Sequence, residues 1–585
     1  MQSLGAFKTV WLVDFEFIPE EPLCEPICLV AHEFKSAQTI RVWHNQFRSG
    51  PPYSVGPDSL FVAYSAAAEL GCHLALGWPL PERVLDLYFE FKHQVNGVLP
   101  RKAPRKLLAA LTHYGLSGIE AVEKREMIEL ILRGGPWSQK EKADLLEYCE
   151  SDVIALRKLL PVMLPKIRLP YALLRGRFAG ALSQVIGVPI DVPLFNRLQT
   201  NWNPIQERLI TEIDRDYGLF EGRVFKHNKF AEWLTRENIA WPLTETGQLC
   251  LDDDTFNDLS KTYPKLKPIR QLRQALSGMR LHDLKLSKHG FNQCFLNPYG
   301  SSTSRNQPSS TEFIFGPAKW LRGLIEPPQG YGISYLDWGG QEFGTAAALS
   351  QDKNMMQAYL SGDAYLWFAK KGSLLPANAT KKSHPEQREL FKTAILGINY
   401  GIGRESLALL INASILFAQR ILDLHHELFA DYWRWSDRAL NHAVLFGWQQ
   451  TVFDWIYRLP REPNPRSIRD FHMQANGAEL LRLAICLASE NGIQVCAPVH
   501  DAILIMAPLE NLDADVLRMK TIMAEASHVV LNGFELFTNS VEVRFPDRYF
   551  PKGGEAMWKL VVGLLAEVEA AVGASKSSDQ ILQSL

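Results

Sequence analysis

The chain has 585 residues, a net charge of −2, 46% hydrophobic residues and 22% charged residues. This length suits three or four domains with packed cores, and the balanced charge excludes a chain that is basic throughout, so any surface for nucleic acid must be local. The eight cysteines include no C-x-x-C pair, which favours reduced thiols over a zinc site. The start of the chain lacks a signal-peptide pattern and no apolar run reaches the ~18 residues that span a bilayer, so we expect a cytoplasmic protein without a membrane partner.

The first acidic cluster begins in residues 9–17, TVWLVDFEF, which predict a buried strand ending in acids. Asp14 and Glu16 lie two residues apart, so their side chains share one face of the strand. Further strand-like runs at 27–30 and 40–43, followed by alternating strands and helices to about residue 160, predict an α/β domain. A strand ending in D-x-E is equally compatible with two structural acids.

A helix predicted from about residue 140 to 160 adds Tyr148 and Asp152 at a spacing of i, i+4, on one face. Three carboxylates on separate segments suit two Mg²⁺ ions, which prefer hard oxygen ligands. One ion would generate a hydroxide and the other would stabilise a departing 3′ oxygen. Tyr148 is then placed to orient the attacking water.

These residues resemble the DEDD 3′→5′ exonucleases of the Y subtype. In that family a motif like H-N-x-x-F-D supplies the fourth acid, and the matching stretch here is Tyr64-Ser65-Ala66-Ala67-Ala68-Glu69. The resemblance implies that Glu69 replaces the family's Asp as a metal ligand and that Ser65 replaces its Asn, with a weakened exonuclease as an alternative. Asp86, in V-L-D-L, is the rival fourth acid, and we expect it to be structural.

After a boundary at about 164–170, residues 171–290 are expected to be mostly helical. Within them, residues 261–290 carry eight Lys or Arg against a single acid, Asp283. The alternatives are a solvated helix face and an arm that grips a phosphate backbone without reading its sequence. The candidate DNA contacts in this segment are Arg270, Arg273, Arg280 and Lys285.

A second acidic pair comes from two distant segments. Residues 332–343 predict a strand running into Asp337, a Gly turn, and a helix that begins at about Glu342. Residues 494–507 predict a β-hairpin that presents His500 and Asp501 at its turn. The two aspartates form a second candidate Mg²⁺ site.

Between these segments, Arg388, Lys392, Leu396 and Tyr400 recur every four residues and share one face of a predicted helix that ends at the glycines 401 and 403. Two cations and an aromatic on one stripe suit a nucleotide: Arg388 and Lys392 would hold the triphosphate, Lys392 would assist the leaving pyrophosphate, and Tyr400 would pack at the templating pair. The alternative is a solvated amphipathic helix.

Taken together, the segments at 337–342, 388–401 and 500–502 resemble motifs A, B and C of the family A DNA polymerases, in that order. The family's D-Y-S-Q-I-E, R-x-x-x-K-x-x-x-F-x-x-x-Y-G and H-D-E are matched by D-W-G-G-Q-E, R-x-x-x-K-x-x-x-L-x-x-x-Y-G and H-D-A. Leu396 replaces an aromatic and Ala502 replaces a carboxylate. The resemblance implies that Glu342 excludes a ribose 2′-hydroxyl and that His500 and Leu396 border the incoming dNTP.

Three further segments support the resemblance. Thr303-Ser304-Arg305 resembles the family's T-G-R, and Arg466 to Gln474 resembles R-x-x-x-N-x-x-x-Q with Asp470 in place of Asn. Residues 187–191 resemble the entry to the polymerase region. The resemblance implies that Arg305, Arg466 and Gln474 contact primer–template DNA.

The implied architecture is an α/β and α+β multidomain fold in which an RNase H-like 3′→5′ exonuclease domain precedes a right-hand polymerase. Its expected parts are the exonuclease (1–165), the start of the polymerase region and thumb (166–300), palm (301–350), fingers (351–460), palm again (461–552), and a C-terminal helix with a tail (553–585).

The implied activity is template-directed addition of dNTPs to a primer 3′-OH with proofreading, using two Mg²⁺ per site, for which Mn²⁺ can substitute. The layout resembles compact phage and prophage polymerases without a 5′-nuclease domain, which act in a bacterial or phage-infected cell. The alternatives are a variant specialised for a modified purine such as 2-aminoadenine, a single-subunit RNA polymerase, a nuclease with a polymerase-derived binding domain, and a non-catalytic DNA-binding protein.

Overall fold

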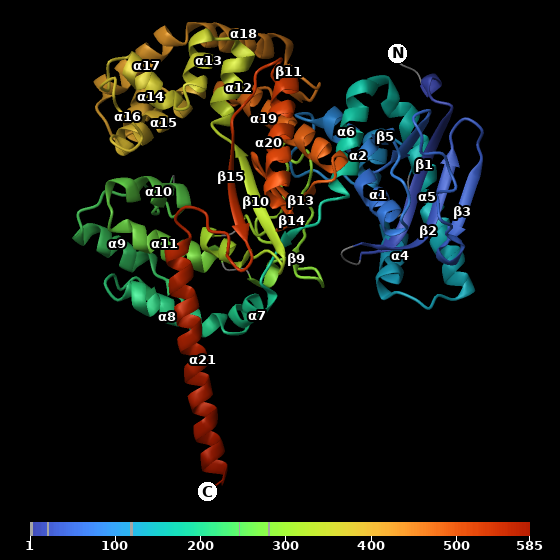
Figure 1. The fold of residues 1–585 in the computed structure, drawn as a ribbon, viewed down its shortest axis with the longest axis horizontal. Helices are drawn as coiled ribbons and strands as arrows, with labels where there is room; N and C mark the ends of the chain where they lie inside the picture. Colours follow the sequence, from blue (N-terminus) through green and yellow to red (C-terminus); the bar gives the residue numbers. More distant parts are fainter. Residues whose placement is uncertain are drawn as a thin grey trace.

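In the computed structural model, the chain forms an N-terminal α/β unit beside a larger body with a central antiparallel sheet (Figure 1). The structure describes residues 4–584 apart from 20–22, 118–120, 245, 279, 280 and 317. The N-terminal sheet has the order β3-β2-β1-β4-β5, in which β1 pairs antiparallel with β2 and parallel with β4. Its strands are β1 (Thr9–Ile18), β2 (Glu25–Glu33), β3 (Thr39–Trp43), β4 (Ser59–Ala63) and β5 (Val84–Asp86).

Helices cover this sheet, and they are α1 (Ala66–Ala75), α2 (Leu87–Val95), α3 (Leu107–His113), α4 (Ala121–Arg133) and α5 (Gln139–Met163). The longest, α5, begins at a capping box in which the Ser138 hydroxyl accepts from the Glu141 N–H and Glu141 accepts from the Ser138 N–H. α5 packs on β1 and β2, so its apolar face buries the sheet residues that flank the acids of β1.

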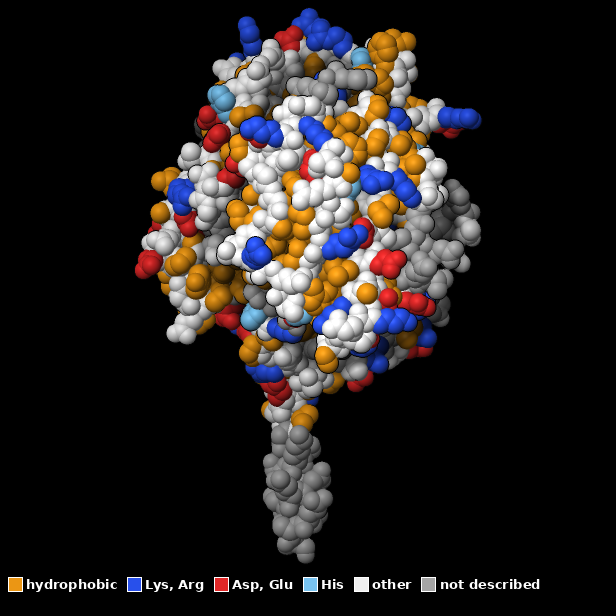
Figure 2. All heavy atoms as spheres, turned by 90° about the vertical axis from the view of Figure 1, so that its right-hand side faces the viewer, with side chains coloured by type: hydrophobic (Ala, Val, Ile, Leu, Met, Phe, Trp, Pro, Cys, Tyr) orange, Lys and Arg blue, Asp and Glu red, His pale blue; other side chains and the backbone are white. Residues whose placement is uncertain are grey.

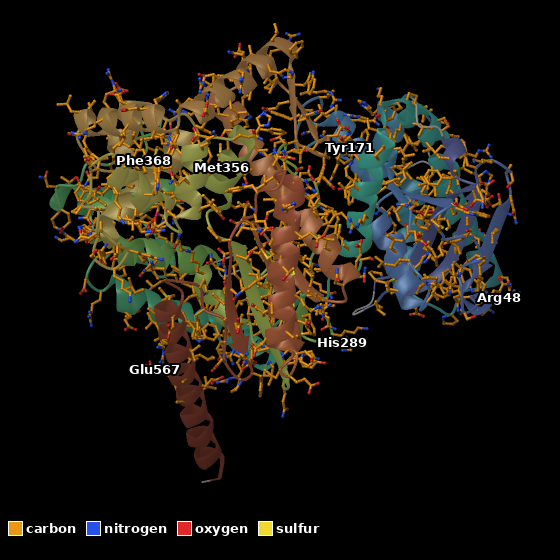
Figure 3. All side chains as sticks on the ribbon, turned by 45° about the horizontal axis from the view of Figure 1, so that its top comes forward. Arg48, Tyr171, His289, Met356, Phe368 and Glu567 are labelled. Atoms are coloured by element: carbon orange, nitrogen blue, oxygen red, sulfur yellow. The ribbon has the colours of Figure 1, made fainter. Side chains whose placement is uncertain are left out.

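Helix α6 (Leu169–Leu182) joins the two parts of the molecule, because it packs on β5 and α1 and also on α19 of the body. Gly176 lies so close to β5 that an added Cβ would stand 1.9 Å from the Val84 carbonyl oxygen. Tyr171, in the first turns of α6, lies at the junction in Figure 3. The helix therefore holds the α/β unit against the body.

The central sheet has the order β13-β14-β10-β15, with all pairs antiparallel. Its strands are β10 (Tyr331–Trp338), β13 (Gln494–Val499), β14 (Ala502–Pro508) and β15 (Thr538–Arg544). Two long helices, α19 (Pro465–Glu490) and α20 (Leu512–Val530), pack on it and on each other. Ile333, Leu336 and Trp338 of β10 are fully buried, which fixes the strand that carries Asp337.

A helical group lies over one end of the sheet, and Met356 and Phe368 mark it in Figure 3. It contains α12 (Gln341–Ser350), α13 (Lys353–Leu360), α14 (Ala364–Lys371), α15 (Pro385–Asn399), α16 (Arg404–Leu410), α17 (Ile415–Leu428) and α18 (Ala430–Phe446). The hairpin of β11 (Trp448–Gln450) and β12 (Ile456–Arg458) leads from it to α19.

A second helical group lies at the other end of the sheet (Figure 1). It contains α7 (Val192–Thr200), α8 (Trp202–Asp214), α9 (His227–Arg236), α10 (Asp253–Thr262) and α11 (Leu266–Gly278), with the short pairs β6 (Val188–Pro189) with β9 (Phe291–Asn292) and β7 (Phe220–Glu221) with β8 (Val224–Phe225). Phe230, Trp233 and Phe256 form a separate small core here.

The C-terminal helix α21 (Glu555–Ser584) packs on α8 and then projects from the body (Figure 1). The expected separate tail is wrong, because the helix continues to Ser584. Glu567 labels this helix in Figure 3.

The expected mixed α/β multidomain fold is confirmed. Figure 2, which views the N-terminal unit, shows Lys and Arg interspersed with acids and apolar side chains, in keeping with the net charge of −2. Among the described residues, no single helix has the length and apolar composition of a membrane span, although the bent pair Arg404–Leu410 and Ile415–Leu428 passes by those two criteria together.

Candidate functional site

Asp337 and Asp501 meet at one end of the central sheet. Asp337 lies near the end of β10, opposite Ala502 of β14, and Asp501 stands in the tight turn immediately before Ala502. The turn is possible because His500 adopts a φ of +56°, a left-handed conformation that few residue types accept readily. The sheet register therefore brings together two acids that are 164 residues apart in the sequence (501 − 337).

The electrostatics of this pair suit a cation. Burial raises the pKa of Asp337, and the charge of Asp501 raises it further. Burial also raises the pKa of Asp501, against the lowering effects of Arg305 and His500. Two carboxylates in a partly buried corner repel each other when both are ionised. A divalent ion bound between their oxygens would offset this repulsion. Asn539 of β15, opposite Asp337 in the register, is a neighbour that no sequence signal indicated.

Glu342 lies in the first turn of α12, after Gly340, whose φ is +64°. The Tyr400 hydroxyl donates a hydrogen bond to Glu342 Oε2, and Arg305 Nη2 lies 3.3 Å from Glu342 Oε1. Tyr400 is half-buried, and the pKa of its hydroxyl is raised first by this burial and then by the charge of Glu342. The structure thus joins the predicted Glu342, Tyr400 and Arg305 into one contact, with the carboxylate held in place from both sides.

Helix α15 presents the predicted row of residues. Arg388 is engaged by Asp363, at 2.6 Å between Nε and Oδ2, and its guanidinium lies over the Tyr365 ring. Lys392 Nζ lies 3.6 Å from Glu389 of the same helix. Leu396 is half-buried on the same face, and the helix ends at Asn399, with Tyr400 as its C-cap before Gly401. Asp363 was missed, since it lies 25 residues before the arginine that it binds.

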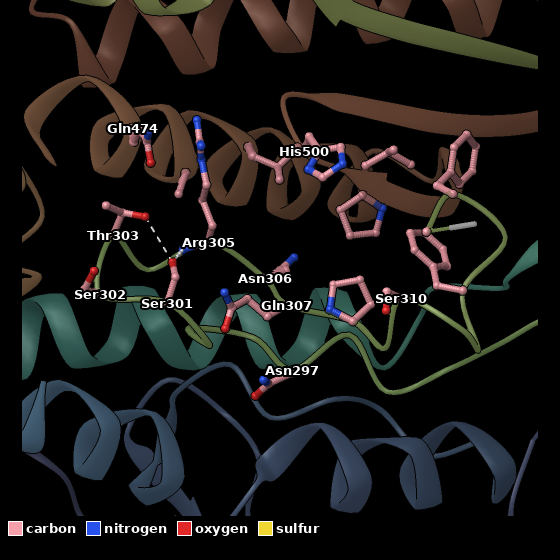
Figure 4. Close-up of a pocket in the computed structure, with 18 of the residues that line it drawn as sticks. Asn297, Ser301, Ser302, Thr303, Arg305, Asn306, Gln307, Ser310, Gln474 and His500 are labelled. Atoms are coloured by element: carbon pink, nitrogen blue, oxygen red, sulfur yellow. Dashed lines mark hydrogen bonds between the residues drawn. The ribbon is translucent and has the colours of Figure 1, made fainter. Parts of the chain in front are cut away.

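A cavity of about 840 Å³ adjoins these residues (Figure 4). Arg305, His500 and Gln474 line it together with Asp470. Arg466 is exposed in the first turn of α19 and is not part of this lining. Of the expected DNA contacts from these segments, the structure gathers Arg305 and Gln474 and leaves Arg466 outside.

Hydrogen bonds from α19 and within the loop itself fix the loop that carries Arg305. Ser304 has a φ of +61°, and its carbonyl and hydroxyl oxygens accept hydrogen bonds from Arg482 at 2.7 and 2.8 Å. The Arg305 N–H donates to the Ser301 hydroxyl at 2.9 Å, and that hydroxyl also contacts Thr303 (Figure 4). Arg482 is buried and was not predicted, because its contacts come from a loop 178 residues away.

The same loop is tied to the N-terminal unit. Lys92 Nζ donates to Asn297 Oδ1 at 2.9 Å, and the Asn96 amide donates to the Ser302 carbonyl at 3.0 Å. Both donors come from the end of α2. The α/β unit therefore helps to position the wall of the cavity.

Asp470 is the acid among the cations of this wall. Burial raises its pKa to about 6, the charge of Glu342 adds to that effect, and Arg305 and Gln474 act in the opposite direction. Its Oδ1 atom is buried and accepts no hydrogen bond from the part of the chain that the structure describes.

A second cavity of about 860 Å³ extends toward the α7–α11 group and shares Ser310 and Gly316 with the first. Arg270 and Arg273 line it, and so do Lys319, Arg322 and Lys552, which sequence reasoning missed because they are isolated in the chain. Of the predicted basic arm, only Arg270 and Arg273 line this cavity.

Arg273 is packed between the rings of Phe225 and Phe256 and donates to the Leu251 carbonyl, and Arg270 is paired with Asp253. Lys285 is exposed and is not in the lining of either cavity. Arg280 lies outside the described residues.

The first acidic cluster also assembles. Asp14 and Glu16 share one face of β1, and their carboxylate oxygens lie within 4.8 Å of each other and of the Cys149 sulfur. Burial raises the pKa of Tyr148, and the charges of Asp152, Glu16 and Asp14 raise it further, which places the phenol among all three predicted acids. Cys149 was missed because a buried cysteine beside an i, i+4 pair has no distinguishing pattern.

Glu69 and Asp86 have different surroundings. Glu69 is buried, accepts a hydrogen bond from the Phe15 N–H at 2.8 Å, and has a pKa well above its usual value through burial and then the charge of Asp14. Asp86 caps α2 by accepting from Tyr88 and Phe89, and also accepts from the Ser65 and Ala66 N–H groups. Glu69 therefore faces the acidic cluster, whereas Asp86 is used by the backbone.

A family-model match and a similar solved fold both relate this chain to nucleic-acid polymerases. Residues 317–541 match the family model described as DNA polymerase family A. The chain is similar to a DNA polymerase of Mycobacterium phage D29 (27% identical, 41% of this chain and 39% of that protein) and to DNA polymerase I of Aquifex aeolicus (22% identical, 68% and 74%). Its fold is similar to the solved POL domain of Pol1 from M. smegmatis in complex with DNA primer-template and dNTP, with a TM-score of 0.65, 16% identity, and 91% and 95% of the two chains covered.

The family-model match over residues 317–541 and the similar fold confirm the resemblance inferred from motifs A, B and C. The aligned segment spans about two fifths of the length of the phage D29 relative.

Proposed function

We propose that the protein is a DNA-directed DNA polymerase that adds dNTPs to the 3′-OH of a primer paired with a template, and that it serves phage-type DNA replication. The main support is that Asp337 and Asp501 lie together at the end of the central sheet, beside Glu342 and the cavity that Arg305 lines. Primer extension with dNTPs or with rNTPs tests this proposal, and an RNA polymerase would prefer the latter.

The residues of the site would have separate roles in one in-line transfer of a nucleotide to the primer 3′-OH. Asp337 and Asp501 would hold two Mg²⁺, or Mn²⁺ in substitution, which activate the primer hydroxyl and stabilise the leaving pyrophosphate. Arg388 and Lys392 of α15 would bind the triphosphate, with Arg388 leaving Asp363 to do so, while Leu396, Tyr400 and His500 border the sugar and base. Bases are selected by pairing with the template, and Arg305 and Gln474 position the duplex without reading its sequence.

The second cavity, which several cations line, would accommodate the phosphate backbone of the duplex. The α12–α18 group acts as the fingers, the central sheet as the palm, and the α7–α11 group as the thumb. Lys319, Arg322 and Lys552, with Arg270 and Arg273, supply cations along the second cavity. Counterion release from phosphates then gives affinity that falls with salt.

We propose further that the N-terminal unit is a 3′→5′ exonuclease that removes mispaired primer ends. Asp14, Glu16, Asp152 and Glu69 would hold the metal ions, and Tyr148 would orient water at the 3′ phosphate. The proximity of Asp14 and Glu16 to each other, and the mutual influence of the acids on Tyr148, support this assignment. A weakened exonuclease is the second candidate function of this unit. It is favoured because one carboxylate oxygen of the buried Glu69 already accepts a hydrogen bond from the Phe15 N–H and is less available to a metal ion.

Glu342→Ala is expected to raise the use of rNTPs relative to dNTPs by at least ~10-fold, with some loss of dNTP rate. The reason is steric, because the carboxylate is held by Tyr400 and Arg305 and leaves no volume for a 2′-oxygen, which would also lack a hydrogen-bond partner. Single-nucleotide incorporation with matched rNTP and dNTP measures the ratio. Asp363→Asn serves as a comparison that changes triphosphate affinity through Arg388 and leaves the ratio alone. An unchanged ratio in Glu342→Ala would show that another residue excludes ribose.

Glu69→Gln and Asp86→Ala are expected to separate two roles. Glu69→Gln keeps the acceptor for the Phe15 N–H but removes a charge, so excision should fall about 10- to 100-fold with little change in melting temperature. Asp86→Ala removes the cap of α2 and should cost about 1–2 kcal/mol of stability, with a milder loss of excision. Digestion of a mispaired primer and a thermal melt on both variants distinguish them. Greater loss of excision in Asp86→Ala, with an unchanged melting temperature, would reverse the assignment.

A further inference from the structure

Two cysteines are in contact beside the first acidic cluster. Cys24 directly precedes β2 and is half-buried, whereas Cys72 lies in α1 and is fully buried. Their sulfur atoms are 3.6 Å apart, at hydrogen-bond distance for two thiols. The residues are 48 positions apart in the sequence, so no local pattern indicated the contact. The fold therefore brings together two thiols that a small movement could join in a disulfide.

The two thiols differ in ionisation and in access. The pKa of Cys24 is lowered, chiefly by its hydrogen bond with Cys72. The pKa of Cys72 is well above its usual value, first through burial and then through the same hydrogen bond. Oxidants react with the thiolate, and redox-sensing cysteines are accessible, acidic and close to a second cysteine. Cys24 thus suits the attacking role and Cys72 the resolving role.

Other cysteines lack this combination of access and acidity. Cys28 and Cys149 of the same unit are both fully buried. Cys294 is half-buried, but burial and the charge of Glu312 raise its pKa to about 12. A thiol that is enclosed or firmly protonated reacts slowly with an oxidant.

We propose that Cys24 and Cys72 form an oxidative modification site, at which hydrogen peroxide converts the two thiols to a disulfide and thereby slows excision. The effect on excision rests on the proposed exonuclease function. The state with both thiols free is the reduced form of this site. Disulfides that form in a reducing compartment are usually transient and redox-sensing, which suits a reversible modification.

The reaction has two steps. The Cys24 thiolate attacks one peroxide oxygen, an S–O bond forms as the O–O bond breaks, and the departing hydroxide takes up the proton that Cys24 lost and becomes water. The Cys72 sulfur then attacks the Cys24 sulfur, an S–S bond forms as the S–O bond breaks, and the hydroxyl leaves with the Cys72 proton as a second water. The two thiols lose two electrons, and the peroxide gains them.

The position of Cys72 connects this site to the proposed exonuclease. Cys72 follows Glu69 by three residues on the same face of α1, and α1 packs on β1 (Figure 1). A disulfide needs its sulfurs about 2 Å apart, so α1 and the start of β2 must move toward each other. Glu69 also accepts a hydrogen bond from the Phe15 N–H of β1 at 2.8 Å. Movement of α1 therefore shifts Glu69 relative to the acids of β1, and a misplacement of ~1 Å can cost about 100-fold in rate.

The test starts from the full-length chain with all thiols reduced. The chain is treated with hydrogen peroxide, catalase removes the excess, and free thiols in one portion are alkylated before digestion, so that mass spectrometry maps any peptide linking residues 24 and 72. Excision of a mispaired 3′ nucleotide and extension of a matched primer are measured on the remainder, before and after addition of dithiothreitol. The variants are Cys24→Ser and Cys72→Ala, and Cys250→Ser, which changes a half-buried cysteine of the α7–α11 group, is the matched control.

Peroxide should link residues 24 and 72 in the parent and lower excision by at least ~10-fold, because Glu69 is displaced. Extension should not change, and dithiothreitol should restore excision. Cys24→Ser and Cys72→Ala should each keep their excision rate after peroxide, whereas Cys250→Ser should lose it as the parent does.

Absence of the linked peptide, with other cysteines oxidised instead, would overturn the modification site. A linked peptide with unchanged excision, or equal loss of excision in the parent and in both Cys24→Ser and Cys72→Ala, would overturn the control of excision. Absence of excision by the reduced parent would contradict the proposed exonuclease, and with it that control, while the linked peptide would still decide whether the disulfide forms.

Discussion

Asp337→Ala or Asp501→Ala should reduce primer extension by more than ~100-fold and leave excision of a mispaired 3′ end near the parent rate. Loss of a residue that merely supports a metal ligand typically costs 10- to 100-fold, and these carboxylates would be the ligands themselves. The two carboxyls share one corner of the sheet, where each has a raised pKa. Ala502, the residue after Asp501, offers no carboxylate to replace either of them. Extension of a matched primer and digestion of a mispaired one measure the two activities on the same preparation.

Asp513→Ala is the control for this pair, since Asp513 is an exposed acid at the start of α20, bound to Arg544 at the far end of β15. It should keep both activities. Loss of excision together with extension in Asp337→Ala would contradict two separate sites, and extension that survives in both palm variants would contradict the assigned catalytic pair.

Asp14→Ala combined with Glu16→Ala should abolish excision, by more than ~100-fold, and leave extension of a matched primer unchanged. The two carboxylates share one face of β1 and lie within 4.8 Å of each other and of the Cys149 sulfur, so removing both leaves Asp152 and Glu69 on separate helices without the strand ligands. The measurement is release of the 3′ nucleotide from a labelled single-stranded or mispaired primer in Mg²⁺.

The comparison variant is Asp58→Ala, an exposed acid just before β4 that pairs with Lys8 at the surface of the same unit. It should not affect excision. Residual excision at the parent rate in the double variant would show that the N-terminal unit does not use this cluster, and a parallel loss of extension would show that the unit supports polymerisation through its contacts with the cavity wall.

Local sequence patterns predicted the elements that carry the sites. The buried strand that carries Asp14 and Glu16, the strand and Gly turn before Glu342, and the hairpin at His500 all form near where the sequence indicated them, although the first strand continues past its two acids to Ile18. Each depends on short-range rules, such as side chains two apart on a strand sharing a face. The order of the three motifs along the chain then indicated the resemblance to family A DNA polymerases.

Contacts between distant segments were not predictable from one sequence. Asp363 binds Arg388, Arg482 fixes Ser304, and Lys92 reaches Asn297 from another unit. Such contacts depend on how helices pack, and a lone acid or cation carries no periodic pattern that distinguishes a partner from a solvated charge. The basic segment 261–290 shows the converse, because its cationic pattern was clear while Arg273 turns inward between two aromatic rings.

The most direct test of the central claim is extension of a labelled primer on a DNA template by the purified full-length chain, with dNTPs, in the presence and absence of Mg²⁺. We predict template-directed addition that requires Mg²⁺ and that uses dNTPs in preference to rNTPs. This activity should disappear in Asp337→Ala and should remain in the Asp14→Ala, Glu16→Ala variant. Extension that continues after chelation of divalent ions, or absence of extension with an intact fold, would contradict a polymerase built on Asp337 and Asp501.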